Sequence, residues 1–189
     1  FLYHPHFLFN ALNTVYFQID ESNKAPRRTL EMISELLRYQ LYGGNQKVSI
    51  LQEIDYLKTY IALRKLRMSE RLRLRVEFPP ELNELNIYPL LFLPLVENAF
   101  KYVGGDYQLD IIMKWENNRI SLFIRNSIPE LSAEDEALRK SVDERQRKGI
   151  GLVNLRRRLS LLYPNKHRLE TRKEETEFVA ELMIEIEDI

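Results

Sequence analysis

Two histidines separated by a single proline stand near the start of the chain, within the stretch FLYHPHFLFNALNTV. Apolar residues recur here at helical spacing, which predicts a helix in which each residue turns by about 100°. His4 then shares the apolar side, whereas His6 lies on the opposite side, in line with Asn10 and Asn13. Chelation of one metal ion by both imidazoles needs a shared direction, which this spacing does not supply. The pattern therefore disfavours a metal site.

His6 is open to two interpretations. An imidazole nitrogen is a competent nucleophile near neutral pH, because with a pKa of about 6.5 much of it is unprotonated. Taken alone, however, an outward-facing histidine is more often an ordinary surface residue. For His4 we favour packing on the apolar side near the start of the helix.

The second stretch with chemical potential is LPLVENAFKYV. On a helix, Glu97, Asn98 and Lys101 fall on one polar stripe, because they are spaced by three and four residues. Such a stripe can be a surface ion pair. The same groups also suit a Mg²⁺–polyphosphate, in which carboxylate and amide oxygens bind the metal and the amine meets phosphate.

A third stretch, KGIGLVNLRRRLSLLYPNK, places two glycines directly before a helical pattern. Backbone amides at Gly149 and Gly151 can approach an anion closely, and the positive end of the helix dipole favours negative charge there. The three arginines at positions 156–158 either belong to this chemistry or form the solvated face of the helix.

Helices and strands must position these groups. Helical periodicity at 8–19 and at 30–41, with a short polar connector at 20–24, predicts an antiparallel helical hairpin that Gly43-Gly44 ends. The apolar face of a lone hairpin can be covered by a second copy, so we expect a dimeric four-helix bundle. A third helix is predicted after Ser49, because Ser49 with Gln52 or Glu53 forms a helix-capping pattern, and it runs to about Met68.

The remaining chain alternates strands and helices without regular repetition. Strands are predicted at 72–78, 109–115, 120–126, 167–173 and 177–186, with a turn at Asn117-Asn118, and helices at about 89–103 and 150–163. Residues 127–148 are charged and lack periodicity, which predicts a mobile loop or lid. This order indicates an α+β sandwich, with one mixed sheet covered by helices on one face.

Composition excludes several classes of function. The 189-residue chain has 28 basic and 28 acidic side chains, which argues against a dedicated nucleic-acid surface. It has no cysteine, and therefore no disulfide, thiolate metal site or thiol nucleophile. The longest apolar run, around 88–96, is far shorter than the roughly 20 residues of a membrane helix. The chain starts without methionine or a signal-like segment, so we expect it to be part of a longer protein.

In this order, PHFLFN, LPLVENAFKYV and GIGLVNLRRRLSLLYP resemble the motifs of the LytS-type sensor histidine kinases. In that family a phosphoacceptor helix hairpin precedes an ATP-binding domain of the GHKL (Bergerat-fold) superfamily. The stretch LQEIDYLKTYIALRKLRM is also similar to the family's linking helix. Over the whole chain, the resemblance implies a phosphoacceptor and dimerisation hairpin at 1–45 and an ATP-binding catalytic domain at 46–189, with its lid at about 127–148.

The activity that this resemblance implies is that of a protein histidine kinase in a two-component system. The chain would use ATP and Mg²⁺ to phosphorylate itself and then transfer the phosphoryl group to an aspartate of a response-regulator receiver domain. Its partners would be a second copy and that receiver domain. It would be the cytoplasmic portion of a membrane-anchored bacterial protein, with membrane contact only through an upstream sensor region.

The resemblance also implies site residues, position by position. His6 would be the phosphoacceptor, backed by Asn10, and Glu97 would polarise a water or the acceptor. Asn98 would coordinate Mg²⁺. The other residues expected at the nucleotide are Lys101, Tyr102, Asn126, Gly149, Gly151, Leu152 and Asn154.

The chain departs from the family pattern at three of these places. The adenine-recognising box, of D-x-G-x-G character in the family, reads NSIPE here, so that Asn126 replaces the aspartate and no glycine follows. Tyr102 replaces a common histidine, and Phe7 leaves no carboxylate beside His6. The altered box keeps a second function open, a GHKL-type nucleotide-binding or degenerate scaffold module that regulates by dimerisation without kinase activity.

Overall fold

The computed structural model describes residues 5–42, 46–80, 82, 85–130 and 150–186. Its contacts divide the chain into two compact units. The first comprises Phe1–Met68 with Asn86–Pro89, and the second comprises Ser69–Leu85 with Leu90–Ile189. The functional boundary between residues 45 and 46 stays a prediction. Gly43-Gly44 lies outside the described residues.

A helical hairpin opens the first unit, as predicted. Helix α1 (Pro5–Gln18) and helix α2 (Lys24–Tyr42) contact each other. The guanidinium of Arg27 donates to the carbonyl of Ile19 through Nε and Nη2, at 3.1 and 2.9 Å, and so ties the end of α1 to the start of α2. The Asp20 carboxylate accepts hydrogen bonds from the hydroxyl of Ser22 at 2.5 Å and from its backbone N–H at 2.8 Å, and these two contacts, the hydroxyl first, lower the pKa of Asp20.

The third helix, α3 (Ile50–Lys65), also belongs to the first unit and starts where the sequence predicts. Ser49 and Gln52 form a reciprocal capping box, which satisfies backbone N–H groups that the first helical turn leaves unpaired. Helix α3 ends three residues before the predicted Met68. Two short strands, β1 (Val48–Ser49) and β3 (Asn86–Ile87), pair antiparallel and were not predicted, because two residues carry no periodicity.

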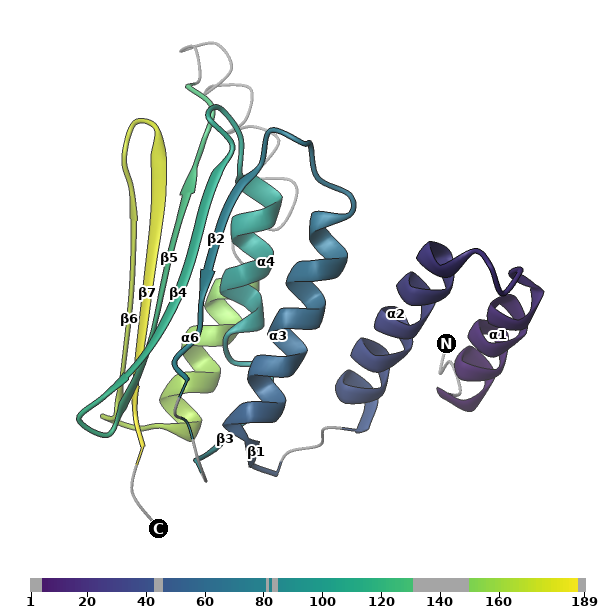
Figure 1. Ribbon diagram of the computed structural model, residues 1–189. Helices are drawn as coiled ribbons and strands as arrows, with labels where there is room; N and C mark the ends of the chain where they lie inside the picture. Colours follow the sequence, from purple (N-terminus) through teal and green to yellow (C-terminus); the bar gives the residue numbers. More distant parts are fainter. Residues whose placement is uncertain (1–4, 43–45, 81, 83–84, 131–149, 187–189) are drawn as a thin grey trace. The chain divides into compact units, whose positions relative to one another are not determined.

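The second unit contains a five-stranded sheet in the order β2-β4-β5-β7-β6 (Figure 1). Its strands are β2 (Arg73–Glu77), β4 (Gln108–Glu116), β5 (Arg119–Ser127), β6 (His167–Lys173) and β7 (Glu177–Glu185). Only β2 and β4 run parallel, so the sheet is mixed, as predicted. The β4–β5 turn is confirmed at Asn117 and Asn118, whose φ angles of 52° and 59° are ones that asparagine tolerates.

Helices α4 (Leu93–Tyr102) and α6 (Ile150–Leu162) lie on the same face of this sheet (Figure 1). Alternate residues of β4 and β5 fill the core beneath them, namely Leu109, Ile111, Met113, Ile120, Leu122 and Ile124. The expected α+β fold, with helices on one face of a mixed sheet, is therefore confirmed. Helix α4 begins at Leu93 rather than Pro89, because Leu90 has a φ of 59° and a left-handed residue interrupts a helix.

Within the described segments, none of the helices is both long and apolar enough to cross a bilayer.

Candidate functional site

His6 lies on the solvent-exposed side of α1, in its first turn. Asn10 and Asn13 are exposed as well. On the predicted apolar side Leu8, Leu12 and Ile19 are half-buried, but Val15 is 46% exposed, so the separation of the two sides is partial. His4 lies outside the described residues.

The side chain of Asn10 sits beside one nitrogen of the His6 ring. Its Nδ2 is 3.2 Å from Nδ1 of His6, at the i, i+4 spacing of a helix. Nε2 makes no hydrogen bond with the described residues, so it is the ring nitrogen available to a reagent in solvent. Thr14 donates back to the carbonyl of Asn10 at 2.9 Å, within the same exposed helix.

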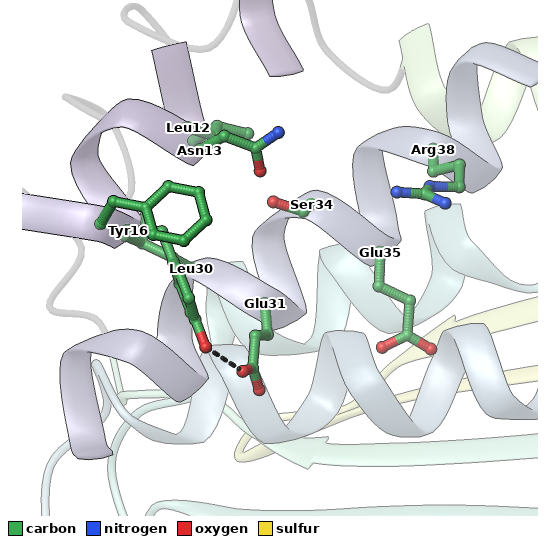
Figure 2. A pocket seen from close by; sticks show the side chains of 9 residues that line it. Leu12, Asn13, Tyr16, Leu30, Glu31, Ser34, Glu35 and Arg38 are labelled. Carbon is green, nitrogen blue, oxygen red and sulfur yellow. Dashed lines mark hydrogen bonds between the residues drawn. The ribbon is translucent and has the colours of Figure 1, made fainter. Parts of the chain in front are cut away.

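A groove runs between α1 and α2 on the hairpin (Figure 2). Its volume is about 460 Å³, and Tyr16 crosses it to donate a hydrogen bond to Glu31 Oε1 at 3.0 Å. Phe17 borders the groove and is 79% exposed. The hairpin therefore presents an incompletely covered aromatic surface with carboxylates beside it.

The polar stripe predicted on α4 is present. Glu97 and Lys101 are exposed and Asn98 is half-buried, whereas the opposite side of the helix is buried through Leu95, Val96, Ala99 and Phe100. The ammonium of Lys101 lies 5.0 Å from the centre of the Tyr102 ring, a cation–π distance.

Asn126 is the most informative of the predicted nucleotide residues. It is fully buried near the end of β5, and its Nδ2 donates to the carbonyl of Ser127 at 3.2 Å. A carbonyl only accepts hydrogen bonds, so the amide nitrogen of Asn126 must face the Ser127 carbonyl, and Oδ1 points the other way. Oδ1 then remains buried without a hydrogen-bond partner among the described residues. Buried acceptors are rarely left without a partner, so this oxygen can accept a hydrogen bond from a donor beyond the described residues.

The start of α6 carries the residues of the predicted phosphate-binding box. Leu152 is half-buried and Asn154 is exposed. No described atom lies within 4 Å of a Cβ built on Gly151, so packing in the described part of the fold does not require glycine there. Gly149 lies outside the described residues, as does most of the predicted lid, from residue 131 onward.

Two of the three arginines on α6 make contacts that sequence analysis did not anticipate. Arg158 donates to the carbonyl of Leu90 at 3.3 Å, and Arg156 donates to the carbonyl of Leu169 at 2.8 Å. Arg158 thus ties α6 to the segment just before α4. Arg156 and Arg157 are exposed, which agrees with the solvated-face interpretation, whereas Arg158 is half-buried.

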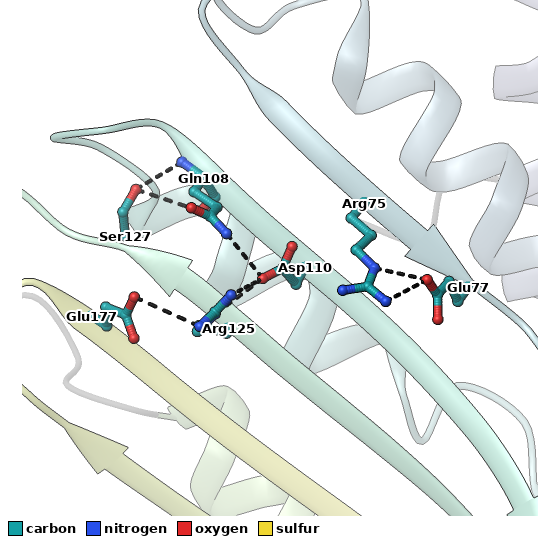
Figure 3. A network of polar contacts seen from close by, with 7 residues as sticks. All are labelled: Arg75, Glu77, Gln108, Asp110, Arg125, Ser127 and Glu177. Carbon is teal, nitrogen blue, oxygen red and sulfur yellow. Dashed lines mark hydrogen bonds and ion pairs between the residues drawn. The ribbon is translucent and has the colours of Figure 1, made fainter.

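The other face of the sheet holds a charged network (Figure 3). Arg125 donates through Nε and Nη2 to Oδ2 of the buried Asp110, at 3.0 and 2.6 Å. This hydrogen bond is the largest cause of the raised pKa of Arg125. Since successive residues of a strand face opposite sides, Arg125 points away from the side that carries Asn126.

These contacts place the predicted nucleotide residues in one unit and His6 in the other. Helix α4 contacts both β5 and α6, so the elements that carry Asn98, Asn126 and Gly151 adjoin one another. No group of three or more histidine, aspartate or glutamate side chains suited to a metal ion occurs among the described residues.

Comparison with known proteins supports the family resemblance. Residues 3–72 match the histidine kinase family model. The sensor protein kinase HptS of Staphylococcus aureus strain USA300 is 28% identical over 172 residues, and the same match occurs in strain NCTC 8325. The aligned region covers 88% of this chain and 33% of HptS, so the chain spans about a third of the length of this relative.

Solved structures support the fold. The histidine kinase domain of the Erythrobacter litoralis EL346 blue-light activated kinase aligns with a TM-score of 0.52 and 14% identity, over 93% of both chains. Acinetobacter baumannii histidine kinase AdeS aligns with a TM-score of 0.50 and 13% identity, over 97% of this chain and 96% of its own. The fold is therefore similar to that of these two histidine kinases. The resemblance to sensor histidine kinases, which the motifs predicted, is confirmed.

Proposed function

We propose that this chain is the catalytic core of a two-component sensor histidine kinase, which phosphorylates itself on His6 from Mg·ATP. The observation that carries the proposal is the buried Oδ1 of Asn126, which has no hydrogen-bond partner among the described residues, because the sequence pattern aligns Asn126 with the family's adenine-recognising aspartate. Residues 3–72, which include His6, match the histidine kinase family model, and this match supports the proposed phosphorylation of His6.

In the transfer, Nε2 of His6 attacks the γ-phosphorus of ATP. The new N–P bond forms as the bond to the β,γ-bridging oxygen breaks and ADP leaves, and the ring then loses its Nδ1 proton to solvent. Nε2 needs a free lone pair, so the reactive neutral tautomer carries its proton on Nδ1. A half-turn of the Asn10 amide would let Oδ1 accept a hydrogen bond from the Nδ1–H group, since Asn10 already lies beside Nδ1. Asn10 would thus select the reactive tautomer.

At the nucleotide, Asn98 would supply an amide oxygen to Mg²⁺ and Lys101 would meet phosphate. Both lie on the polar stripe of α4, with Glu97 and Tyr102 beside them. Phosphoryl transfer depends mainly on positioning and charge neutralisation, which such groups provide. The start of α6, with Gly149, Gly151, Leu152 and Asn154, would approach the triphosphate.

Asn126 fits adenine in spite of the missing carboxylate. The exocyclic amino group of adenine is a donor, and Oδ1 of Asn126 is an acceptor that the described residues leave unused. The contact of Nδ2 with the Ser127 carbonyl keeps the amide donors turned away from the base.

A second copy of the chain is the proposed cover for the hairpin, as in a four-helix bundle. None of the described residues of α1 is buried, and its aromatic residues Phe7 and Phe17 are 67% and 79% exposed. Burial of such surface is the usual driving force for association. The phosphoryl group would pass from His6 to an aspartate of a response-regulator receiver domain, and the chain would be the cytoplasmic part of a membrane-anchored protein.

The test is incorporation of phosphate from Mg·ATP labelled at its γ-phosphate. We expect label that is stable to base and labile to acid, and its near-complete loss in Asn98→Ala. The matched control Asn13→Ala, an exposed asparagine on α1, should keep the label. Binding of Mg·ATP without any labelling, in the full-length protein as well as in this chain, would instead support the nucleotide-binding scaffold.

A further inference from the structure

Ser127, the last residue of β5, forms hydrogen bonds through both its side chain and its backbone carbonyl. Figure 3 shows the bonds between its side chain and Gln108. Its Oγ donates to the carbonyl of Gly104 at 2.6 Å and accepts from the backbone N–H of Gln108 at 2.9 Å. Its own carbonyl accepts from the N–H of Gly104 at 3.0 Å and from Nδ2 of Asn126 at 3.2 Å. Ser127 is buried, with 7% of its surface exposed, so these bonds are shielded from water.

Gly104 therefore donates its N–H to Ser127, and its carbonyl accepts from Ser127 Oγ as well as from the N–H of Tyr107 at 3.0 Å. Gly104 is two residues beyond the end of α4, where the final turn of a helix leaves carbonyls without helical partners. The site is also sterically closed, because a Cβ on Gly104 would lie 2.8 Å from Cγ of Pro129. Hydrogen bonds and close packing thus hold the end of α4 against the end of β5.

The same serine also sets the orientation of Asn126. The Ser127 carbonyl holds Nδ2 of Asn126, and that contact leaves Oδ1 as the free acceptor. One residue consequently links the helix that carries Asn98 and Lys101 with the amide proposed to read the base.

We propose that Ser127 is a positioning residue, which fixes the distance between the metal- and phosphate-binding stripe of α4 and the base-binding amide of Asn126. This inference rests on the proposed nucleotide-binding function. A ligand that bridges both groups, such as Mg·ATP, depends on that distance, whereas adenosine, which meets only the base-binding end, depends on it much less.

The test compares two ligands across matched variants. Ser127→Ala removes the Oγ bonds to Gly104 and Gln108 and keeps the carbonyl that holds Asn126. We expect it to weaken Mg·ATP binding by about tenfold or more, as for loss of buried hydrogen bonds, with adenosine affinity changed less than about threefold. Ser127→Thr, which retains the hydroxyl, should restore Mg·ATP binding. The control Ser121→Ala lies on the same strand, six residues from Ser127, and should change neither affinity.

Gly104→Ala disturbs the same contact from the α4 end and should also weaken Mg·ATP binding more than adenosine binding. This second variant tests the proposal even if Ser127→Ala does not fold. Equal weakening of both ligands, or no weakening of Mg·ATP by either folded variant, would overturn the positioning role. Absence of Mg·ATP binding by the wild-type protein would instead overturn the proposed function itself, so the two failures are distinguishable by calorimetry.

Discussion

The helical hairpin and the sheet unit differ in how far each completes its own core. In the sheet unit, β5 buries Ile120, Leu122 and Ile124 to within 1% exposure. In the hairpin, α1 buries none of its described residues, and α2 buries only Met32 and Leu36. The sheet unit therefore has a buried apolar core of its own, whereas the hairpin exposes apolar surface that a partner can cover.

The two units also carry different parts of the proposed chemistry. The nucleotide residues lie on well-packed elements, where a small displacement costs affinity. His6 and Asn10 lie on an exposed helix, where a reacting group must be reachable. Rigid surroundings suit the proposed binding of nucleotide, and an accessible surface suits a residue that, on this proposal, would meet both ATP and a receiver domain.

The largest expected effect concerns the cores themselves. Leu122→Ala should lower the free energy of unfolding by about 2–5 kcal/mol, because Leu122 is fully buried and truncation leaves a cavity. Leu12→Ala, on the half-buried side of α1, should cost clearly less at protein concentrations that keep the chain monomeric. Urea denaturation measures both, and equal losses would remove the distinction between the two units.

The next effect concerns the contact between α2 and α3, the best-packed part of the first unit. Tyr39 donates to Oε2 of the buried Glu53 at 2.6 Å and stacks on Tyr56, with ring centres 4.7 Å apart. Tyr39→Phe should cost about 1–3 kcal/mol, since a buried carboxylate loses a donor. An unchanged denaturation midpoint would mean that this contact does not stabilise the unit.

The same residue gives a pH dependence. Burial, followed by the charge of Glu53, raises the pKa of Tyr39 well above its ordinary value of 10.0. The folded protein therefore holds this proton more tightly than the unfolded chain, so the stabilisation is complete below pH 10 and is lost as pH rises above it. Thermal unfolding between pH 8 and 11, with Tyr39→Phe as the reference, should show a steeper decline in the wild type. Parallel curves would contradict the assignment.

A third effect tests the uncovered side of the hairpin. Phe17→Ser should leave the unfolding free energy of the monomer nearly unchanged, because Phe17 is 79% exposed, and should weaken self-association by about tenfold. Sedimentation equilibrium gives the dimer constant. Leu161→Ser, an equally exposed leucine on α6, is the control and should not alter association. Loss of association only in the control would place the dimer contact in the sheet unit.

The smallest effect concerns the tautomer of His6. Asn10→Asp places an acceptor beside Nδ1 that cannot donate, so it should retain the rate of phosphorylation or increase it a few-fold. Asn10→Leu offers no acceptor and should slow the reaction a few-fold, because the ring then returns to its own balance of tautomers. If the two variants have the same rate, Asn10 does not act through the ring proton.

Much of the fold could be predicted from the sequence because its signals are local. The capping pattern at Ser49 fixes the start of α3, and Asn117-Asn118 fixes the β4–β5 turn, as both need only neighbouring residues. The strands β1 and β3 could not be predicted, since their two-residue pairing depends on segments 38 residues apart. The late start of α4 was missed because nothing in the sequence shows that Leu90 is left-handed.

Candidate site residues could be selected from the sequence by their types, but their contacts could not be predicted. The motifs select Asn98 and Asn126 as candidates, yet only the folded structure shows that the Asn126 amide is oriented by a backbone carbonyl. Ser127 gave no signal, because a serine at a strand end is common and its partner Gly104 lies 23 residues away in the sequence.

The central claim, that His6 accepts the phosphoryl group, is tested most directly by mapping the modified residue. The protein is incubated with Mg·ATP and digested at neutral to basic pH, and the position of the phosphate is read by tandem mass spectrometry. The chain contains three histidines, of which His167 lies in the sheet unit with Nδ1 2.7 Å from the Tyr163 carbonyl. We expect phosphate on His6 and none in His6→Gln. Phosphate on His4 or His167, or undiminished labelling of His6→Gln, would contradict it.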